Sequence, residues 1–288
     1  MGNQIAKFKK YVDLLDEVYQ NESKTAVLES DATLAQAGAN ANEIVIPKLD
    51  MDGLGDYDRN SGYVNGNVTL TNETVQFNYD RGRKFSVDNM DNEETAGLAF
   101  GKLASEFIRT KVTPEQDAFR FAKYAELAGT KVSGTLSAGT DVLAALQAAT
   151  AAMDNDEVPS ENRHLFITPA LLIAAQNVDT NKSRDILGAF ASITKVPQAR
   201  FYTAIALKNG KSSGEEDGGF EKAEGGKDIN FLIAEKSAVM QYTKHKVNKA
   251  IPPEDNPDAD AWIFNFRAYG LSDVYENKTA GIYLHHKA

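Results

Sequence analysis

The sequence predicts a mixed α+β fold, in which a helix-rich middle lies between two β-rich segments. Apolar and polar side chains alternate within residues 43–88, apolar side chains recur at helical spacing within residues 91–177, and strand patterns return after residue 200. The regular succession of strand, helix and strand that marks a doubly wound parallel sheet is absent from the sequence. We therefore expect one large domain or two small ones with separate helical and β layers.

Composition narrows the class of protein. The chain has 288 residues, a formal net charge of -10 and no cysteine, which excludes disulfides, thiol catalysis and zinc–thiolate sites. No apolar run approaches the roughly 20 residues that cross a bilayer, and the first residues lack the apolar core of a signal peptide. The acidic charge argues against tight, sequence-independent binding of nucleic acid. We expect a protein that binds no membrane.

Residues 1–42 predict an N-terminal arm. Its apolar residues alternate spacings of three and four, as in the seam of a short helix: Ile5, Phe8, Val12, Leu15 and Tyr19. A helix this short is marginal alone in water, so the seam is expected to dock on the chain's own core or on a neighbouring chain. Residues 21–42, rich in Ala, Asn and Ser, then form a weakly ordered bridge.

Residues 43–88 predict a projecting β-hairpin. Val68 and Leu70 alternate with polar residues before the polar residues 71–73, and the same alternation follows at Val75, Phe77 and Tyr79. Two such runs around a short polar stretch are typical of an antiparallel hairpin. Its apolar face is thin, and an isolated two-stranded hairpin is marginal in water, so we expect its partner surface on another subunit.

Two helices are predicted next. Asp91 and Glu94 form a capping box for a helix over residues 91–112, whose apolar stripe is Ala96, Phe100, Leu103 and Phe107. The helix is expected to stop at Val112, because Thr113-Pro114-Glu115 carries the start signals of a second helix that ends at Gly129.

The remaining elements follow from shorter patterns. A third helix starts near Thr140, and its apolar register is Val142, Leu146, Ala149 and Met153. A strand over 164–167 and a helix over 169–177 come next, and five further strands are expected over 201–207, 229–233, 239–243, 262–269 and 281–284. Residues 208–228 are polar and Gly-rich and predict a mobile loop, and residues 251–260 predict an irregular connector.

No motif carries convincing chemistry. Residues 210–214 match the letters G-x-S-x-G, but the polar, Gly-rich continuation does not form the helix that a nucleophile elbow requires. Residues 50–58 have the carboxylate density of a calcium loop, yet Ser61 stands where a bidentate Glu is needed, so a Gly-and-Asp turn is the better interpretation. The adjacent His285 and His286 of a strand point to opposite faces and do not easily share a metal. We expect no catalytic residue, cofactor or metal.

A basic cluster has two interpretations. Arg81, Arg83 and Lys84 precede a group of acids at Asp88, Asp91, Glu93 and Glu94. They form either a solvated surface with weak ion pairs, each worth about 0–1 kcal/mol, or complementary charge between chains that sets their orientation. The residue pattern leaves both open.

Several blocks in a fixed order resemble one known family. They are residues 44–47 (IVIP), 53–59 (GLGDYDR), 62–64 (GYV), 83–88 (RKFSVD), 90–91 (MD) and 112–121 (VTPEQDAFRF). Over about residues 40–286 the chain is similar to the major capsid proteins of tailed phages and prophages. The resemblance implies the Hong Kong 97-type fold, with an N-terminal arm (1–42), an extended β-hairpin loop (43–88), a peripheral domain that contains a long spine helix (89–130 and 248–275) and an axial domain (131–247 and 276–288).

The resemblance also implies function and partners. It implies a virion protein, not an enzyme, that assembles in the host cytoplasm through pentamers and hexamers into an icosahedral head shell around double-stranded DNA. Only about 40 residues precede the extended loop, which implies a separate scaffolding protein, and the shell implies a portal protein. The runner-up is the shell protein of an encapsulin-like bacterial compartment. Two further alternatives are a carboxylate-dependent hydrolase that uses Asp50, Asp52 and Asp56, and a binding module that uses the N-terminal seam.

For the shell, we expect the subunit interface to use residues of the hairpin, of the basic cluster and of the two predicted helices. These residues are Arg59, Tyr63, Val75, Phe77, Tyr79, Arg81, Arg83, Lys84, Glu93, Glu94, Asp117 and Arg120.

Overall fold

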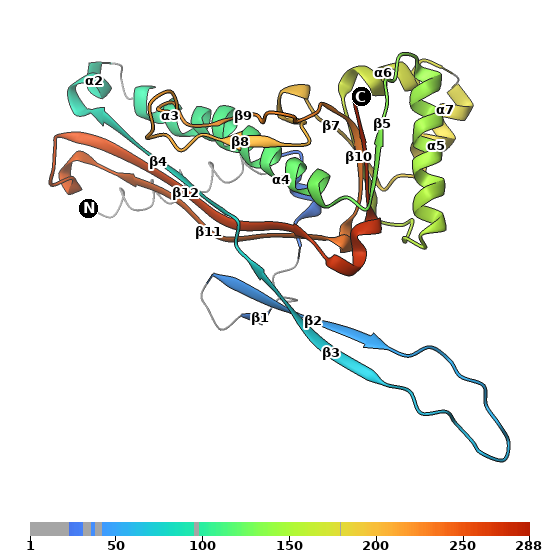
Figure 1. Cartoon of the computed structure of the whole chain (residues 1–288). Coiled ribbons are helices and arrows are strands. Elements are labelled where there is room, and N and C mark those ends of the chain that lie inside the picture. Colours follow the sequence, from blue (N-terminus) through green and yellow to red (C-terminus); the bar gives the residue numbers. More distant parts are fainter. Residues whose placement is uncertain (1–22, 31–35, 38–41, 95–97, 179) are drawn as a thin grey trace.

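The computed structural model describes residues 23–30, 36–37, 42–94, 98–178 and 180–288, without the side chains of residues 36, 37, 93, 94, 98–101 and 180. The seam predicted for residues 5–19 lies outside the described residues, as do the side chains of Ala96 and Phe100. The mixed α+β fold is confirmed. Two sheets and their helices form a body, from which a β-ribbon projects (Figure 1).

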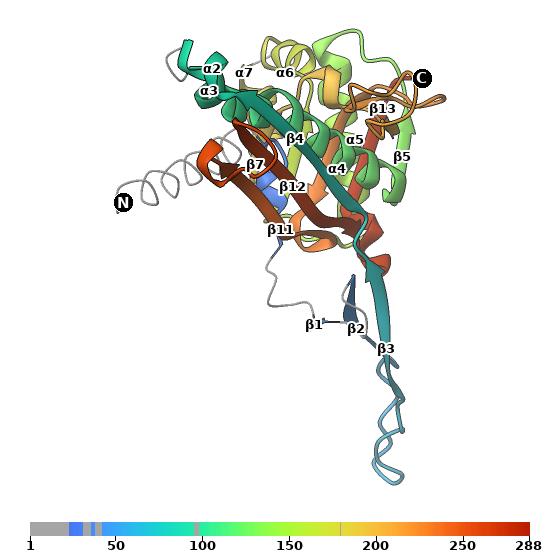
Figure 2. The same cartoon turned by 90° about the vertical axis from the view of Figure 1, so that its left-hand side faces the viewer.

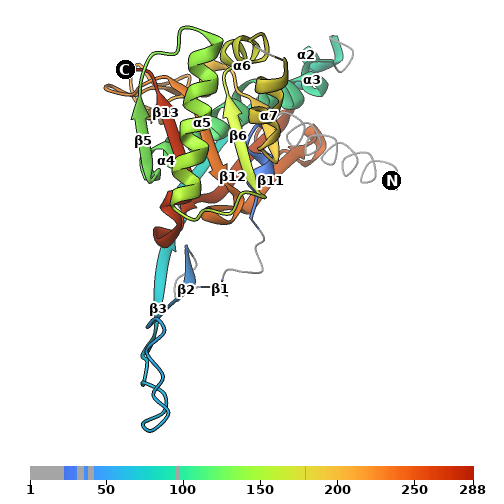
Figure 3. The same cartoon turned by 90° about the vertical axis from the view of Figure 1, so that its right-hand side faces the viewer.

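The first sheet has five strands and is covered on both faces. Its order is β5 (Thr130–Ser133), β13 (Ile282–His286), β10 (Ile229–Glu235), β6 (Arg163–Ile167) and β7 (Ser192–Lys195). The neighbouring strands β10 and β6 are buried throughout, including their polar side chains Arg163, His164 and Asn230. One face packs on the helices α5 (Gly139–Asn155), α6 (Pro169–Gln176) and α7 (Thr180–Gly188), which lie in front of the sheet in Figure 3. The other face packs on α4 (Thr113–Leu127).

The second sheet has three strands, in the order β11 (Val239–Ile251), β12 (Ala261–Val274) and β4 (Tyr79–Asp88). Phe264, Phe266 and Ala268 alternate along β12 and face a cluster that includes Ile108 and Val112. This sheet therefore packs against the helical segment that runs across the body, and it carries the root of the ribbon.

That helical segment is continuous from residue 98 to residue 127. After α2 (Asn89–Glu94), α3 (Leu98–Phe107) passes through a π-helical turn, η3 (Ile108–Val112), straight into α4. The predicted stop at Val112 is wrong, because Val112 keeps helical angles (φ -67, ψ -54). Pro114 lacks an N–H, and the wider turn gives the backbone N–H and Oγ1 of Thr113 the same acceptor, the carbonyl of Ile108.

The ribbon consists of β2 (Glu43–Met51) and β3 (Val68–Gln76), which pair antiparallel from Glu43↔Gln76 to Met51↔Val68, and β2 also pairs with β1 (Gln36–Ala37). The predicted turn at residues 71–73 is wrong, because these residues lie in the middle of β3 and the connection is instead residues 52–67. Figures 1 and 2 show the ribbon leaving the body at the β3–β4 junction. The predicted range 43–88 thus holds both the ribbon and β4, a strand of the body.

Residues 208–228 are not entirely a loop. They contain β9 (Phe220–Lys222), which pairs with β8 (Ile205–Leu207), so the predicted strand over 201–207 shortens to its last three residues. Three elements were not predicted from the sequence: β5, β7 and α7. The other predicted strands and the helices near Thr140 and over 169–177 are confirmed. β11 runs on to Ile251, past the predicted domain boundary between residues 247 and 248.

Short helical turns complete the described elements. They are η1 (Ala26–Leu28), η4 (Gln198–Arg200), η5 (Lys236–Ala238), η6 (Pro253–Asp255) and η7 (Glu276–Gly281). Among the described residues, no helix is both long and apolar enough to span a membrane.

Candidate functional site

The outer part of the ribbon exposes an unusual amount of apolar surface. Leu49 pairs with Leu70 and Met51 with Val68, so these four side chains lie on one face of the ribbon, and each is more than half exposed. The connection adds four more exposed side chains: Leu54, Tyr57, Tyr63 and Val64. Eight of the twelve large exposed hydrophobic residues in the described part of the chain therefore lie on one projection, which marks an interaction surface.

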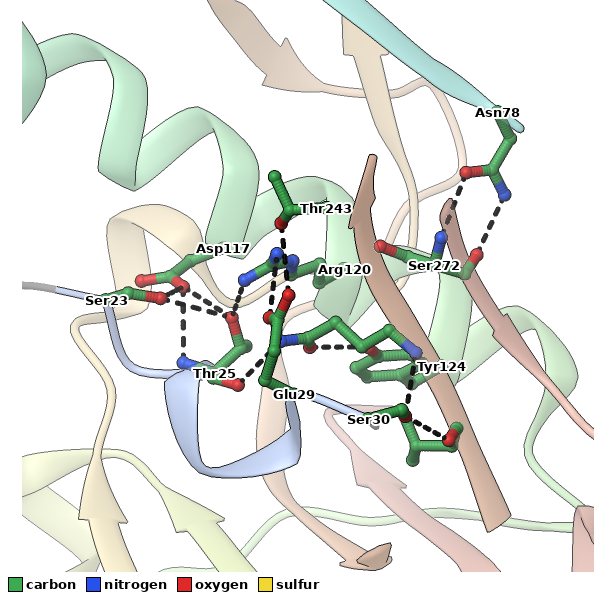
Figure 4. Close-up of polar contacts among 12 residues, drawn as sticks. Ser23, Thr25, Glu29, Ser30, Asn78, Asp117, Arg120, Tyr124, Thr243 and Ser272 are labelled. Carbon is green, nitrogen blue, oxygen red and sulfur yellow. Dashed lines mark hydrogen bonds and ion pairs between the residues drawn. The ribbon is translucent and has the colours of Figure 1, made fainter. Parts of the chain in front are cut away.

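The root of the ribbon is fixed firmly to the body. Ile44 and Val75 are each 8% exposed and pack on Met240, Tyr242 and Leu271. At the β3–β4 junction, the side-chain amide of Asn78 donates to the carbonyl of Ser272 at 2.8 Å and accepts from its N–H at 3.1 Å (Figure 4). The direction of the projection is thus set by the body.

Charged side chains of the ribbon and of the body also contact each other near the root. Lys48 of β2 forms a 3.2 Å ion pair with Glu276 of η7. Burial, and then the nearby Glu276 carboxylate, raise the pKa of Glu73. Phe77, just beyond β3, stacks on Tyr269 with 5.0 Å between ring centroids, and the ammonium of Lys244 lies 4.7 Å from the Phe77 ring.

A groove lies on the body between β4, the α3–η3 helix and the β8–β9 hairpin. Its volume is about 1060 Å³, and its apolar lining includes Phe85, Leu103, Phe107 and Phe266. More basic than acidic residues line the groove. The acidic residues are Glu106, Glu115 and Asp217, and the basic residues are Arg81, Arg83, Lys102, Lys111 and Lys208.

Two arginines of β4 connect this groove to the β8–β9 hairpin. Arg81 forms a two-pronged ion pair with Glu115 (2.7 and 3.3 Å), and this hydrogen bonding raises the pKa of Arg81. Arg81 also donates to the carbonyl of Gly219, and Arg83 donates to that of Glu216. The two side chains thus hold the Gly-rich loop in place, a role that the sequence pattern did not indicate.

Eight of the twelve predicted interface residues lie on the ribbon or at its root, on β4, or outside the described side chains. Arg59 and Tyr63 lie at the exposed outer end of the ribbon, and Arg81, Arg83 and Lys84 lie on β4, where Lys84 and Arg83 are exposed. Phe77 is half-buried at the root. The side chains of Glu93 and Glu94 lie outside the described residues. For these eight residues the role at a subunit interface stays a prediction.

Four other predicted interface residues are buried inside the chain. Val75 and Tyr79 are 8% and 4% exposed, and Asp117 and Arg120 are 0% and 2% exposed. Their side chains contact the same chain, so the structure contradicts a direct role at a subunit surface. Tyr79 packs on Phe119 and donates a hydrogen bond to Glu115.

Asp117 and Arg120 instead anchor residues 23–30 to α4 (Figure 4). The carboxylate of Asp117 accepts hydrogen bonds from the Ser23 hydroxyl (3.0 Å), from the Lys24 N–H (2.9 Å) and from the N–H and hydroxyl of Thr25. Arg200 completes the set with an ion pair of 3.1 Å. We call residues 23–30 the strap.

The strap is also bound to the second sheet. Arg120 donates to the Thr25 hydroxyl at 2.9 Å, and Gln241 of β11 donates to the Thr25 carbonyl and to Glu29. Tyr124 donates to Gln241 at 2.8 Å, and burial raises the pKa of the Tyr124 hydroxyl. Leu28 is fully buried in the core beside Phe121 and Phe201, so the strap is part of the body.

The structure gives the motif candidates no catalytic setting. Residues 210–214 lie in the turn of the β8–β9 hairpin, without a following helix. Across the described ranges no three His, Asp or Glu side chains gather as a metal site would require, and Asp50, Asp52 and Asp56 lie on the ribbon.

Comparison with known proteins identifies the fold. The sequence matches no protein-family model and no curated protein. A solved structure from Gordonia phage Cozz matches with a TM-score of 0.61 at 11% identity, over 93% of this chain and 87% of that chain. The capsid structure of Staphylococcus phage Andhra matches with a TM-score of 0.57 at 10% identity, over 91% and 83% of the two chains.

A third match comes from outside the phages. The crystal structure of a virus-like particle from Pyrococcus furiosus has a TM-score of 0.59 at 10% identity, over 97% of this chain and 99% of that chain. The matches extend over most of both chains, so they compare whole folds. The chain has the Hong Kong 97-type fold of phage capsid structures, which confirms the fold inferred from the resemblance.

Proposed function

We propose that this chain is the major capsid protein of a tailed phage or prophage, a shell subunit without catalytic activity. The observation that carries the proposal is the ribbon, whose outer apolar face is uncovered by the described body although its root is rigidly held. Large exposed apolar surfaces are uncommon on monomers and favour burial against a partner. Repetition of one such contact among copies builds a closed assembly.

The groove on the body is the proposed acceptor for the ribbon of a neighbouring copy. Residues 49–70 of the ribbon carry four aspartates and a single arginine among their apolar side chains. The groove has the complementary character, an apolar lining with an excess of basic side chains. Complementary charge of this kind orients two partners, while apolar burial supplies most of the affinity.

The domains take the roles that the family resemblance implies. The five-stranded sheet and its helices correspond to the axial domain (131–247 and 276–288), which groups copies into pentamers and hexamers. The α3–α4 helix, β12 and the last residues of β11 correspond to the peripheral domain (89–130 and 248–275), and the ribbon to the extended loop (43–88). The range 43–88 also includes β4, and residues 239–247 of β11 fall within the axial range, so the β11–β12–β4 sheet crosses these bounds. Scaffolding and portal proteins are the proposed partners, the enclosed genome is double-stranded DNA, and the virion is the proposed location.

An encapsulin-like compartment shell is the second candidate. The match to the Pyrococcus furiosus virus-like particle, which covers 99% of that chain, favours keeping it. Particles purified from producing cells distinguish the two, because a phage head packages its genome as double-stranded DNA while a compartment shell encloses protein cargo.

The test replaces apolar side chains on the ribbon face. In the double variant Met51→Ser/Leu70→Ser, subunits are expected to keep the wild-type melting temperature, because both side chains are more than 60% exposed. Sedimentation and electron microscopy are expected to show loss of closed particles. The control is Met90→Ser on α2, which removes a side chain that is 64% exposed on the body and lies outside the groove lining, and should leave assembly intact. Normal particles from the double variant would refute the proposal.

A further inference from the structure

We propose that Asn65, in the connection at the outer end of the ribbon, is a site of spontaneous deamidation in the unassembled chain, and that the product assembles poorly. The second half of this inference rests on the proposed shell function; the first half does not. Asn is followed by Gly at two places, Asn65-Gly66 and Asn209-Gly210. A glycine after Asn exposes its backbone nitrogen to the Asn side chain, because no Cβ hinders the approach.

The reaction needs only water. The Gly66 nitrogen, after its proton leaves to hydroxide, attacks Cγ of Asn65. A new C–N bond closes a five-membered succinimide ring, and the C–N bond to the side-chain amide breaks, which releases ammonia as it takes a proton from water. Water then opens the ring at either carbonyl and leaves Asp or isoaspartate at position 65. Each product carries one negative charge that Asn65 lacks.

The surroundings of Asn65 leave this ring closure unhindered. Asn65 and Gly66 are exposed and lie between β2 and β3, outside both strands. Within the described part of the chain, the Asn65 side chain makes no hydrogen bond, and the Gly66 N–H donates to no backbone carbonyl. The nearest cross-ribbon hydrogen bonds join Asp52 to Asn67, one residue further on.

The second Asn-Gly pair is locked and serves as an internal control. The side-chain oxygen of Asn209 accepts from the N–H groups of Lys211 (2.7 Å) and Ser212 (2.8 Å), and its amide donates to the Ser212 hydroxyl (2.8 Å). Gly210 is held at φ +71, and a Cβ there would lie 2.8 Å from the Arg83 guanidinium. Ring closure at Asn209 would have to break these bonds and turn a packed backbone.

Deamidation at Asn65 changes the part of the molecule that is proposed to dock. Residues 50–58 already carry four aspartates, and Asp52 lies across the ribbon from Gly66. A new carboxylate at position 65 repels Asp52, and an isoaspartate adds a backbone atom just before β3 begins. Chains that remain unassembled would thereby leave the pool of competent subunits, whereas docked ribbons would be shielded from water.

The test ages full-length unassembled subunits in mildly alkaline buffer and follows both Asn-Gly pairs by peptide mass spectrometry. The expected result is a gain of one mass unit at Asn65 that increases with time, labelling of the same peptide by a protein isoaspartyl methyltransferase, and no change at Asn209. An unchanged Asn65, or equal gain at both sites, would overturn the inference.

Two variants complete the experiment. Gly66→Ala should abolish the gain without strain, because its Cβ would meet only Asp52 Cβ at 3.7 Å, and aged Gly66→Ala subunits should assemble like fresh ones. Asn65→Asp should reproduce the assembly loss of aged wild type. If aged and fresh wild-type subunits assemble equally well, the assembly half is wrong. If neither forms particles, the proposed function fails while the mass shift still decides the modification.

Discussion

Asp117 is a fully buried carboxylate that joins two distant parts of the chain, the strap and α4. In Asp117→Asn the charge that pairs with Arg200 is lost, and an amide group faces donors that a carboxylate had satisfied. We expect a loss of about 3 kcal/mol of unfolding free energy, as for other broken buried pairs. Urea unfolding measures this loss, and limited proteolysis should show earlier cleavage near the strap.

The matched control for that prediction is Glu106→Gln. Glu106 pairs with Arg109 at 2.8 Å, but both side chains are at least half exposed. Its removal should change the unfolding free energy by no more than about 0.5 kcal/mol. An equal, small effect of both substitutions would mean that the strap contributes little to the stability of the body.

Two histidines of the five-stranded sheet make stability depend on pH. Burial lowers the pKa of His164, which pairs with Ser192 and faces Lys236 and Glu235, and burial also lowers the pKa of His285 beside His286. Below about pH 6.5 the unfolded chain therefore binds more protons than the folded chain, so stability falls as pH falls. Carboxyl groups with raised pKa, such as Asp273, act in the opposite direction at lower pH.

We therefore expect the melting temperature to decrease from about pH 7.5 to about pH 5.5, and this decrease to be smaller in the double variant His164→Gln/His285→Gln. The comparison of slopes isolates the histidines, since every carboxyl group is common to both proteins. Identical slopes would show that these two side chains do not control the pH response.

At the scale of single elements, the π-helical turn η3 joins α3 and α4 into one continuous helical segment. Thr113→Val removes the hydroxyl that donates to the Ile108 carbonyl at 2.9 Å inside the buried turn. The free energy of unfolding should fall by about 1 kcal/mol, the usual net value of such a bond. Thermal unfolding measures the change, with Thr110→Val, at an exposed position of the same turn, as the control. A larger loss for Thr110→Val would contradict the proposed role of Thr113.

The same scale shows what the sequence could and could not predict. Buried strands and the helix at Thr140 follow from strong periodicity, because their apolar faces pack within the chain. The turn placed at residues 71–73 was wrong because β3 is exposed, so polar residues occur within a strand and resemble a turn. The predicted helix end before Pro114 was wrong, because the π-helical turn before it lets the helix continue although Pro114 has no N–H to donate.

The candidate site was predictable only in part, for a related reason. Exposed apolar residues of the ribbon are visible in the sequence, and so is the basic cluster of β4. Asp117 and Arg120 both form hydrogen bonds with Thr25, which lies 92 and 95 residues earlier in the chain. No local sequence pattern therefore distinguishes these two buried side chains from surface charges. Their assignment required the fold.

At the scale of the whole molecule, the reach of the ribbon and the side chains at its tip make separate contributions to assembly. Met51 and Val68 are the last pair of the ribbon, so a two-residue Asn-Gly turn can replace residues 52–67 without disturbing the strands. The root and body are unchanged in this variant, and we expect a wild-type melting temperature. Closed particles should be lost, because Leu54, Tyr57 and Tyr63 no longer reach a neighbouring copy.

A second replacement, a Gly/Ser segment of the same length as residues 52–67, separates the two contributions. It restores chain length but not the apolar and acidic side chains that are proposed to meet the groove. If side chains supply the contact, both variants remain as subunits or small oligomers by analytical ultracentrifugation and electron microscopy. Rescue by the Gly/Ser segment would show that length alone is required, and closed particles from the Asn-Gly variant would remove the outer ribbon from the assembly contact altogether.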